Sequence, residues 1–132
     1  MNLNTKLRYG LRAILYIYRK DDKFATISEI SEKEKISKRY LENIFYNLKK
    51  GGIIESKKGK MGGFYAKKKP SEITVYDIFK LLIGDIQIVE CLNNVFNCEK
   101  KDFCSTKKLF GELNDIIIKF FKGKTIEELM KS

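Results

Sequence analysis

The chain has 132 residues, carries a net charge of +10, and is 43% apolar. A chain of this length forms one domain or one small domain with an appendage, and its apolar fraction is sufficient for a core, which excludes a disordered basic tail. It contains no histidine, so the commonest general base and zinc ligand are missing and most hydrolase mechanisms are excluded. We therefore expect a protein that is not an enzyme and that binds a polyanion, either nucleic acid or an anionic membrane surface.

The positive charge is concentrated in one segment. Residues 33–69 contain twelve lysines and arginines and three acids, which accounts for nine of the ten net charges. A solvated surface is the ordinary explanation for a run of charge, but this concentration favours nucleic acid. No apolar run approaches the ~18 residues of a membrane span, and the N-terminus lacks a signal-peptide pattern. We expect a cytoplasmic protein with no membrane partner.

Three helices are expected in the first fifty residues. The first ends near Asp21 and Asp22, and a short second helix follows Ser28 as its N-cap. Ser37 is a good N-cap for the third, and Gly51 follows it as a stop signal. The apolar face of the first helix is formed by Leu7, Leu11, Ile14, Leu15 and Tyr18, and that of the third by Leu41, Ile44, Phe45 and Leu48.

The second and third helices read as a helix-turn-helix, whose recognition helix presents its N-terminal residues to the major groove of DNA. Arg39 is the expected reader of a guanine, while Lys38 and Tyr40 are expected to hold phosphates. The alternative is that Ser37 only caps the helix and Tyr40 only packs, and for Tyr40 the two interpretations are equally good.

A β-hairpin is expected directly after the third helix. Residues 53–58 and 64–67 have the pattern of two strands, and residues 59–63 form a glycine-rich turn. In this position the hairpin is typical of a DNA-binding wing. We expect Lys58 and Lys60 to supply counter-charge, and Gly62 and Gly63 to let the backbone approach the phosphates closely.

The C-terminal half is nearly neutral and helical. Thr74 and Asp77 are typical of a capping box at the start of a helix, and Thr125 begins a short last turn. Between them lies a long helix with an apolar stripe that needs a partner surface, which a second copy of the chain would supply. The stripe consists of Leu109, Leu113, Ile116, Ile117, Phe120 and Phe121.

The predicted fold class is mostly α: a winged helix-turn-helix with a two-stranded wing and a long C-terminal dimerisation helix. The expected domain organisation is a DNA-binding domain over 1–83, a cysteine-bearing sensor loop over 84–104, and the dimerisation helix and tail over 105–132.

All three cysteines, Cys91, Cys98 and Cys104, lie within 14 residues, in the expected sensor loop. Thiolates in a loop can converge on one iron–sulfur cluster, for which they are the usual ligands. Redox-active thiols, inert thiols and an incomplete zinc site are the alternatives. An odd number of cysteines in a reducing compartment argues against a disulfide framework.

With these motifs in place, the whole chain resembles the Rrf2 family of bacterial regulators. The matching segments are residues 3–11 at the start, Ile36–Glu42 at the recognition helix, Lys58–Phe64 at the wing and Ile73–Ile78 after it. The wing departs from the family's Arg-Gly-Pro-Gly-Gly-Gly-Tyr at Lys58, Lys60 and Met61.

The resemblance implies a homodimer that crosses two long C-terminal helices and reads a palindromic operator in double-stranded DNA. It also implies an iron–sulfur cluster in some members, in the segment where this chain has its cysteines. Lys107 occupies the place of one type's histidine ligand, and Arg8 that of another type's acidic ligand, so the fourth ligand is unknown. For this reason we expect [4Fe–4S] rather than [2Fe–2S].

The predicted function is therefore a homodimeric DNA-binding transcription regulator gated by an iron–sulfur cluster that senses iron, redox or nitric oxide status. The alternative is a cofactor-free Rrf2-type regulator of cysteine or sulfur metabolism, controlled by a partner protein or by thiol oxidation.

Overall fold

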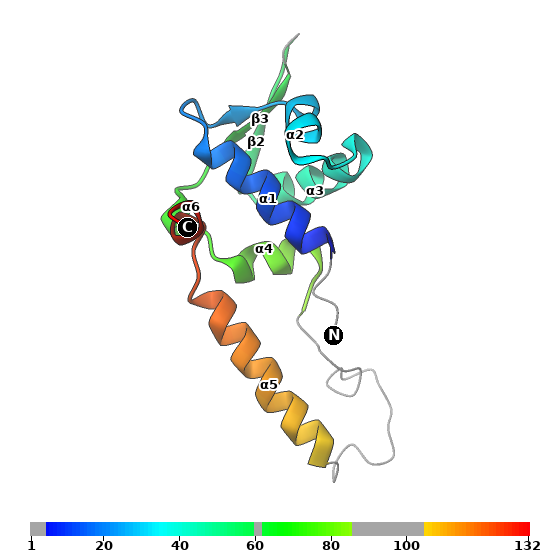
Figure 1. Ribbon diagram of the computed structural model, residues 1–132, viewed down its shortest axis with the longest axis vertical. Helices are drawn as coiled ribbons and strands as arrows, with labels where there is room; N and C mark the ends of the chain where they lie inside the picture. The colour runs from blue at the N-terminus through cyan, green and yellow to red at the C-terminus, as the bar shows by residue number, and fades with distance from the viewer. Residues whose placement is uncertain (1–4, 60–61, 86–104) are drawn as a thin grey trace.

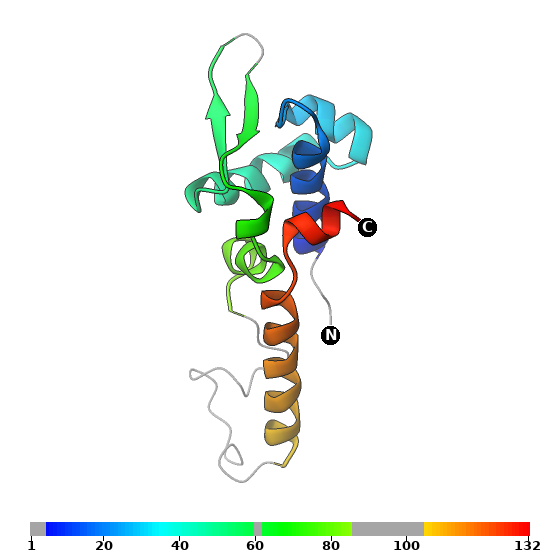
Figure 2. The same ribbon diagram turned by 90° about the vertical axis from the view of Figure 1, so that its left-hand side faces the viewer.

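The computed structural model of the protein describes residues 5–59, 62–85 and 105–132. Helices α2 and α3 and the β-strands lie in one half of the molecule, α4 lies below them, and α5 extends away at the opposite end (Figures 1 and 2). The mostly helical winged helix-turn-helix expected from the sequence is confirmed. The elements in chain order are α1 (Thr5–Arg19), β1 (Phe24–Ala25), α2 (Ile27–Glu34), α3 (Lys38–Lys50), β2 (Ile54–Lys57), β3 (Gly63–Ala66), the 3-10 helix η1 (Pro70–Glu72), α4 (Val75–Leu82), α5 (Ser105–Lys122) and α6 (Ile126–Met130).

Helix α1 lies at the centre of the core, and its buried face is rotated from the predicted one. Leu11 and Leu15 are only half-buried, whereas Ala13 and Ile17 are fully buried. Gly10 explains part of the rotation, because a Cβ there would lie 2.3 Å from Leu82 Cδ1 of α4. The missing side chain therefore lets α4 approach α1 closely on the side of Gly10.

Helix α2 begins two residues earlier than predicted. Its N-cap is Thr26, not Ser28, and the Thr26 hydroxyl accepts a hydrogen bond from the Glu29 amide at 3.0 Å. Thr26 is in extended backbone directly after strand β1, which is the conformation an N-cap requires. Lys35, with φ 58°, ends the helix in the left-handed conformation.

Helix α3 confirms the prediction at both ends and along its buried face. Ser37 is the N-cap, and its hydroxyl accepts from the Tyr40 amide at 3.2 Å. Gly51 is the C-cap, and Gly52 has a φ of +77° that favours glycine. The four predicted core residues of α3 (Leu41, Ile44, Phe45 and Leu48) are fully buried.

The expected hairpin forms, and a third strand joins it. The strand order is β1-β3-β2, with both pairs antiparallel. The two-residue strand β1 was not anticipated from the sequence, because so short a segment shows no alternation. Phe64 on β3 packs against Phe45 of α3 with ring centroids 4.8 Å apart, which attaches the inner face of the sheet to α3.

The chain returns to the core after α5. Thr74 and Asp77 form the predicted capping box at the start of α4. Thr125 caps α6, whose Ile126 is fully buried, and the Ile126 amide donates to the Ile73 carbonyl at 2.9 Å. The C-terminal residues therefore complete the core around α1.

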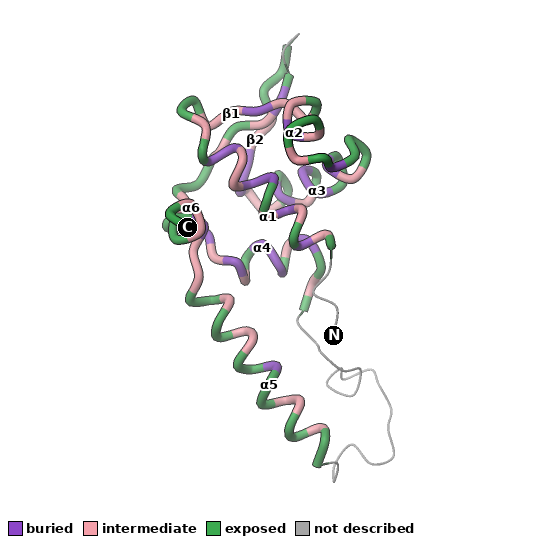
Figure 3. The backbone as a smooth tube through the Cα atoms, in the orientation of Figure 1, coloured by how far each residue is buried: buried purple, intermediate pink, exposed green. Residues whose placement is uncertain are grey.

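Helix α5 stands apart from that core, as the burial colouring in Figure 3 shows. Its predicted stripe splits into two faces. Ile117 and Phe121 pack against the chain's own core, and the ring centroids of Phe121 and Phe79 of α4 lie 6.1 Å apart. Four large apolar side chains stay exposed on the other face: Leu109 at 60%, Leu113 at 40%, Ile116 at 63% and Phe120 at 58%.

Candidate nucleic-acid interface

The first turn of α3 presents two cations to solvent. Lys38 and Arg39 directly follow the Ser37 cap, and both are exposed. The Ser37 hydroxyl is engaged in capping, so this residue has a clear role in fixing where the helix begins. The cap thereby sets the direction in which Lys38 and Arg39 leave the helix.

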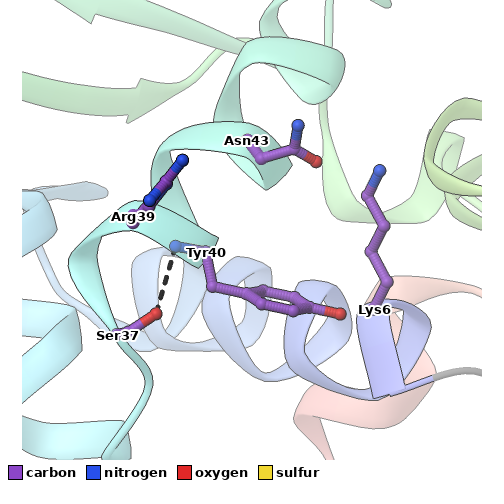
Figure 4. A pocket seen from close by; sticks show the side chains of 5 residues that line it. All are labelled: Lys6, Ser37, Arg39, Tyr40 and Asn43. Carbon is purple, nitrogen blue, oxygen red and sulfur yellow. Dashed lines mark hydrogen bonds between the residues drawn. The ribbon is translucent and has the colours of Figure 1, made fainter.

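Tyr40 is held by packing along α1. Its ring meets the Tyr9 ring edge-on, with centroids 5.4 Å apart and planes at 75°. The Arg12 guanidinium lies 5.5 Å from the Tyr9 centroid and is paired with Glu34. These contacts support the packing interpretation of Tyr40, while its hydroxyl end reaches along α1 towards Lys6 (Figure 4).

Two further residues complete the hollow at the start of α3. Lys6 of α1 and Asn43 of α3 line it together with Ser37, Arg39 and Tyr40 (Figure 4). Neither was singled out from the sequence, although Asn43 lies one turn after Arg39 on the same helix. Within the described part of the chain, the side chains of Arg39 and Asn43 have no hydrogen-bond or ion-pair partner.

Tyr46 extends the same outer face of α3 by a further turn. It is 66% exposed, an unusual state for a large aromatic side chain in a helix whose other face is fully buried. Arg39, Asn43 and Tyr46 are spaced i, i+4 and i+7, the spacing of one helical face. Neither Asn43 nor Tyr46 was singled out from the sequence, although this spacing from Arg39 is the signal that could have found them.

The glycines of the wing take part in the turn and the strand packing of the hairpin. The Gly62 amide donates to the Gly59 carbonyl at 3.1 Å, and Gly59 has a φ of +130°. Gly62 is exposed, but Gly63 is buried because the Phe24 ring and the Ala25 carbonyl of β1 occupy the space that its side chain would take. The packing therefore explains the glycine at position 63, and a DNA contact by the backbone of Gly62 or Gly63 stays a prediction.

Lysines of the wing are exposed on its strands. Lys57 and Lys58 are exposed at the end of β2, while Lys60 lies outside the described residues. A hollow between the start of α2 and the hairpin is lined by Thr26, Ser28, Lys57 and Gly62, among others. The wing thus lies beside the helix-turn-helix and not apart from it.

A polar cluster attaches α1 to α2 behind this surface. Glu29 accepts from the Tyr16 hydroxyl and from the Lys20 ammonium, both at 2.7 Å. The hydrogen bond to Glu29 raises the pKa of Tyr16 to about 12. Burial would raise the pKa of Glu29, but the hydrogen bonds from Lys20 and Tyr16 outweigh it and leave that pKa below its usual value.

A second tyrosine attaches the segment after the wing to the core. The buried Tyr18 hydroxyl donates to the Lys68 carbonyl, and burial raises the pKa of Tyr18 to about 12. Lys67, Lys68 and Lys69 are all exposed. Their positive charge is therefore held on a segment whose backbone is anchored to α1.

The predicted metal ligands Cys91, Cys98 and Cys104 lie outside the described residues. Over residues 5–59, 62–85 and 105–132, no group of three or more histidine, cysteine, aspartate or glutamate side chains is placed to hold a metal ion. In the same ranges no helix is long and apolar enough to cross a bilayer.

Comparison with known proteins agrees with this arrangement. The Rrf2 family model, described as iron-dependent transcriptional regulator, matches residues 3–132. IscR of Photorhabdus laumondii, an HTH-type transcriptional regulator, is 31% identical over 133 aligned positions that span 100% of this chain and 80% of that protein. NsrR of Halalkalibacterium halodurans, another such regulator, is 29% identical over 98% of this chain and 90% of that protein.

The fold is also found among solved structures. CymR, the global cysteine regulator of B. subtilis, aligns with a TM-score of 0.80 and 26% identity, covering 99% of this chain and 97% of that one. These relatives are transcriptional regulators and not enzymes. The chain belongs to the Rrf2 family of transcriptional regulators.

Proposed function

We propose that this regulator reads DNA with the outer face of α3 and holds the DNA backbone with its wing. The observation that carries the proposal is the pair Arg39 and Asn43, both exposed and without a partner in the described chain. Arginine reads guanine and asparagine reads adenine, each through two hydrogen bonds in the major groove. One helical turn separates the pair, so the bases they read lie within about two base pairs of each other.

The remaining predicted residues hold the backbone in this proposal. Lys38 and the wing lysines Lys58 and Lys60 contact phosphates, and Lys6 adds a cation beside the Tyr40 hydroxyl. Phosphate contacts position a protein without specifying sequence, and they make binding strongly dependent on salt. If each subunit neutralises about five phosphates, log K falls with log salt at a slope near ~−9 for a dimer.

The experiment is a selection of duplexes from a random pool by the full-length protein, followed by binding measurements on the selected duplex. Arg39→Ala should cost about 1–3 kcal/mol on that duplex and erase preference at one base pair. Asn43→Ala should erase preference at a neighbouring pair, and Lys58→Ala should weaken all duplexes alike. Recovery of no preferred sequence, or a salt slope near zero, would contradict the proposal.

A homodimer is proposed to bind a palindromic operator. The support is the exposed apolar face of α5, which no described part of the chain covers. A two-fold dimer places two copies of α3 on two half-sites, whose spacing the dimer fixes. A selected consensus with two inverted half-sites is the expected result, and a single asymmetric site would count against the dimer.

The three cysteines are proposed to hold an iron–sulfur cluster, [4Fe–4S] rather than [2Fe–2S], with a fourth ligand from outside the three thiols. The support is their confinement to 14 residues and the family's iron-dependent description. Helix α5 begins at Ser105, next to Cys104, so a cluster would act beside the start of the proposed dimer helix. A change there would bias the spacing of the two recognition helices.

Anaerobic protein supplied with iron and sulfide tests the cluster. We expect a brown protein, iron and sulfide in the ratio of a [4Fe–4S] cluster, and loss of both on changing any one of Cys91, Cys98 or Cys104 to alanine. Protein that takes up neither iron nor sulfide would overturn this part of the proposal without touching DNA binding.

The second candidate is a cofactor-free regulator controlled by a partner protein or by thiol oxidation. The likeness to CymR, a global cysteine regulator, favours it. In this case the protein binds the selected duplex with the same affinity before and after the protein is treated with iron and sulfide. Its affinity then changes with a mild thiol oxidant, or with an added enzyme of cysteine metabolism.

A further inference from the structure

The outer face of the wing is fastened by one aromatic ring. Phe24, on the unanticipated strand β1, pairs with Tyr65 of the central strand β3. Its ring reaches across β3 at Gly63, where a Cβ would lie 2.8 Å from the Phe24 Cζ atom and 2.6 Å from the Ala25 carbonyl oxygen. The space of a side chain at position 63 is therefore filled by Phe24 and the backbone of β1.

The same ring also meets the far strand of the hairpin. Lys57 on β2 is the direct cross-strand partner of Gly63, and its ammonium lies 5.4 Å from the Phe24 ring centroid. A cation at this distance from a ring face is attracted to it. One side chain thus spans all three strands at the end of the ladder that adjoins the turn of the hairpin.

The backbone of Phe24 is fixed on both sides, by the turn after α1 and by the cap of α2. Before it, Lys23 adopts a φ of 53°, and the Asp22 carboxylate accepts from the Phe24 amide at 3.3 Å. After it, Ala25 is fully buried and Thr26 caps α2. The ring therefore joins the wing to strand β1, which leads directly into α2 and so into the helix-turn-helix.

We propose that Phe24 is a positioning residue for DNA binding, holding the basic wing at a fixed place relative to the recognition helix by packing across Gly63 onto Lys57. The inner face of the sheet is held separately by Phe64 on Phe45 and by Lys49, whose ammonium donates to the Ser56 hydroxyl at 2.8 Å. Loss of the Phe24 ring leaves those contacts in place and frees only the outer face. This inference rests on the proposed function, because it assigns the wing lysines to phosphates.

The test compares Phe24→Ala with Phe24→Tyr in the full-length protein, on the duplex that the wild type selects. We expect Phe24→Ala to flatten the salt slope by about one unit per subunit, since one phosphate contact contributes about 0.9. Preference at the base pair read by Arg39 should remain. Phe24→Tyr keeps the ring face and should retain the wild-type slope.

Lys58→Ala separates positioning from general destabilisation. If Phe24 acts through the wing, Phe24→Ala in the Lys58→Ala background should lose much less affinity than it does alone. Gly63→Ala, which forces β1 away from β3, should reproduce the loss of slope. Denaturant unfolding of each free variant confirms that the measurements are made on folded protein.

An unchanged slope in Phe24→Ala, or losses that simply add in the double variant, would overturn the positioning role. A wild type that selects no duplex would instead overturn the proposed function. The two failures are therefore distinguishable in one set of titrations.

Discussion

The winged helix-turn-helix and helix α5 are built from similar apolar residues but differ in whether those residues are covered. In the first region, Ile14, Phe45 and Ile78 are fully buried, and helices α2, α3 and α4 each begin with a side-chain cap. In α5, the buried residue among those described is Asn114, while Ile116 and Phe120 face solvent. The winged helix-turn-helix covers its apolar side chains within one chain. The exposed apolar face of α5 is instead the kind of surface that another chain covers.

The difference separates two sources of stability. A core inside one chain contributes independently of protein concentration, but an interface between chains contributes by mass action. Substitutions that remove the same atoms in the two regions should therefore differ in whether the loss of stability depends on protein concentration.

The largest effect is expected from truncating a phenylalanine in the core. Phe45→Ala should lower the free energy of unfolding by about 3–5 kcal/mol, because it leaves a cavity between α3 and the sheet. Its matched control is Phe120→Ala on α5, which removes the same atoms from an exposed position. Denaturant titrations at two protein concentrations check the contrast: the first loss should not depend on concentration, and the second should. Equal, concentration-independent losses would remove the distinction between the regions.

A charge in the exposed face of α5 should break the dimer and leave the fold intact. Ile116→Glu places a carboxylate in the proposed seam, where desolvation is costly, and should raise the dimer dissociation constant by roughly a hundredfold or more. Sedimentation of the free protein measures this. Lys108→Glu changes charge on the same helix outside the apolar stripe and is the control. A dimer of unchanged strength in Ile116→Glu would mean that another surface holds the subunits together.

A smaller effect is expected where the two regions meet. The Thr74 hydroxyl caps α4, and Thr74 also bridges to Thr125 at the end of the segment that leads from α5 to α6. Thr74→Ala should cost about 1 kcal/mol in the free energy of unfolding, the usual value of an N-cap. Ser71→Ala, at an exposed position nearby, should cost almost nothing. Thermal unfolding of both variants measures the two losses. If the loss for Thr74→Ala does not depend on protein concentration, this junction belongs with the winged helix-turn-helix and not with the exposed face of α5.

The smallest effect concerns acid. Glu29 has a pKa lowered below its ordinary value of 4.5, so its contribution to stability is fully present above that pH. It is lost as the pH falls from there through the lower pKa of the folded state. Glu29→Gln should remove this part of the acid dependence of the unfolding free energy. The acid limb of a stability profile measures it, and an unchanged limb would show that the Lys20 and Tyr16 contacts do not bias the carboxylate.

Local signals in the sequence determined most of the winged helix-turn-helix. Ser37, Gly51 and the Thr74–Asp77 box act within one helical turn, so the residues themselves specify where α3 begins and ends and where α4 begins. The period of Leu41, Ile44, Phe45 and Leu48 defined the buried face of α3 for the same reason. The place of Arg39 in the first turn of that helix followed from the Ser37 cap, and its contact with a base stays a prediction.

Tertiary packing decided the rest, because it depends on atoms distant in sequence. Leu82 of α4 packs closely against Gly10 of α1, and β1 takes its hydrogen-bonding partners from β3. Pairing with β3 also moves the cap of α2 from Ser28 to Thr26, since the chain leaves the strand at that residue. Likewise, the apolar stripe of α5 was visible as one pattern, but only the packing of Phe121 on Phe79 shows which half faces the chain's own core and which half stays exposed.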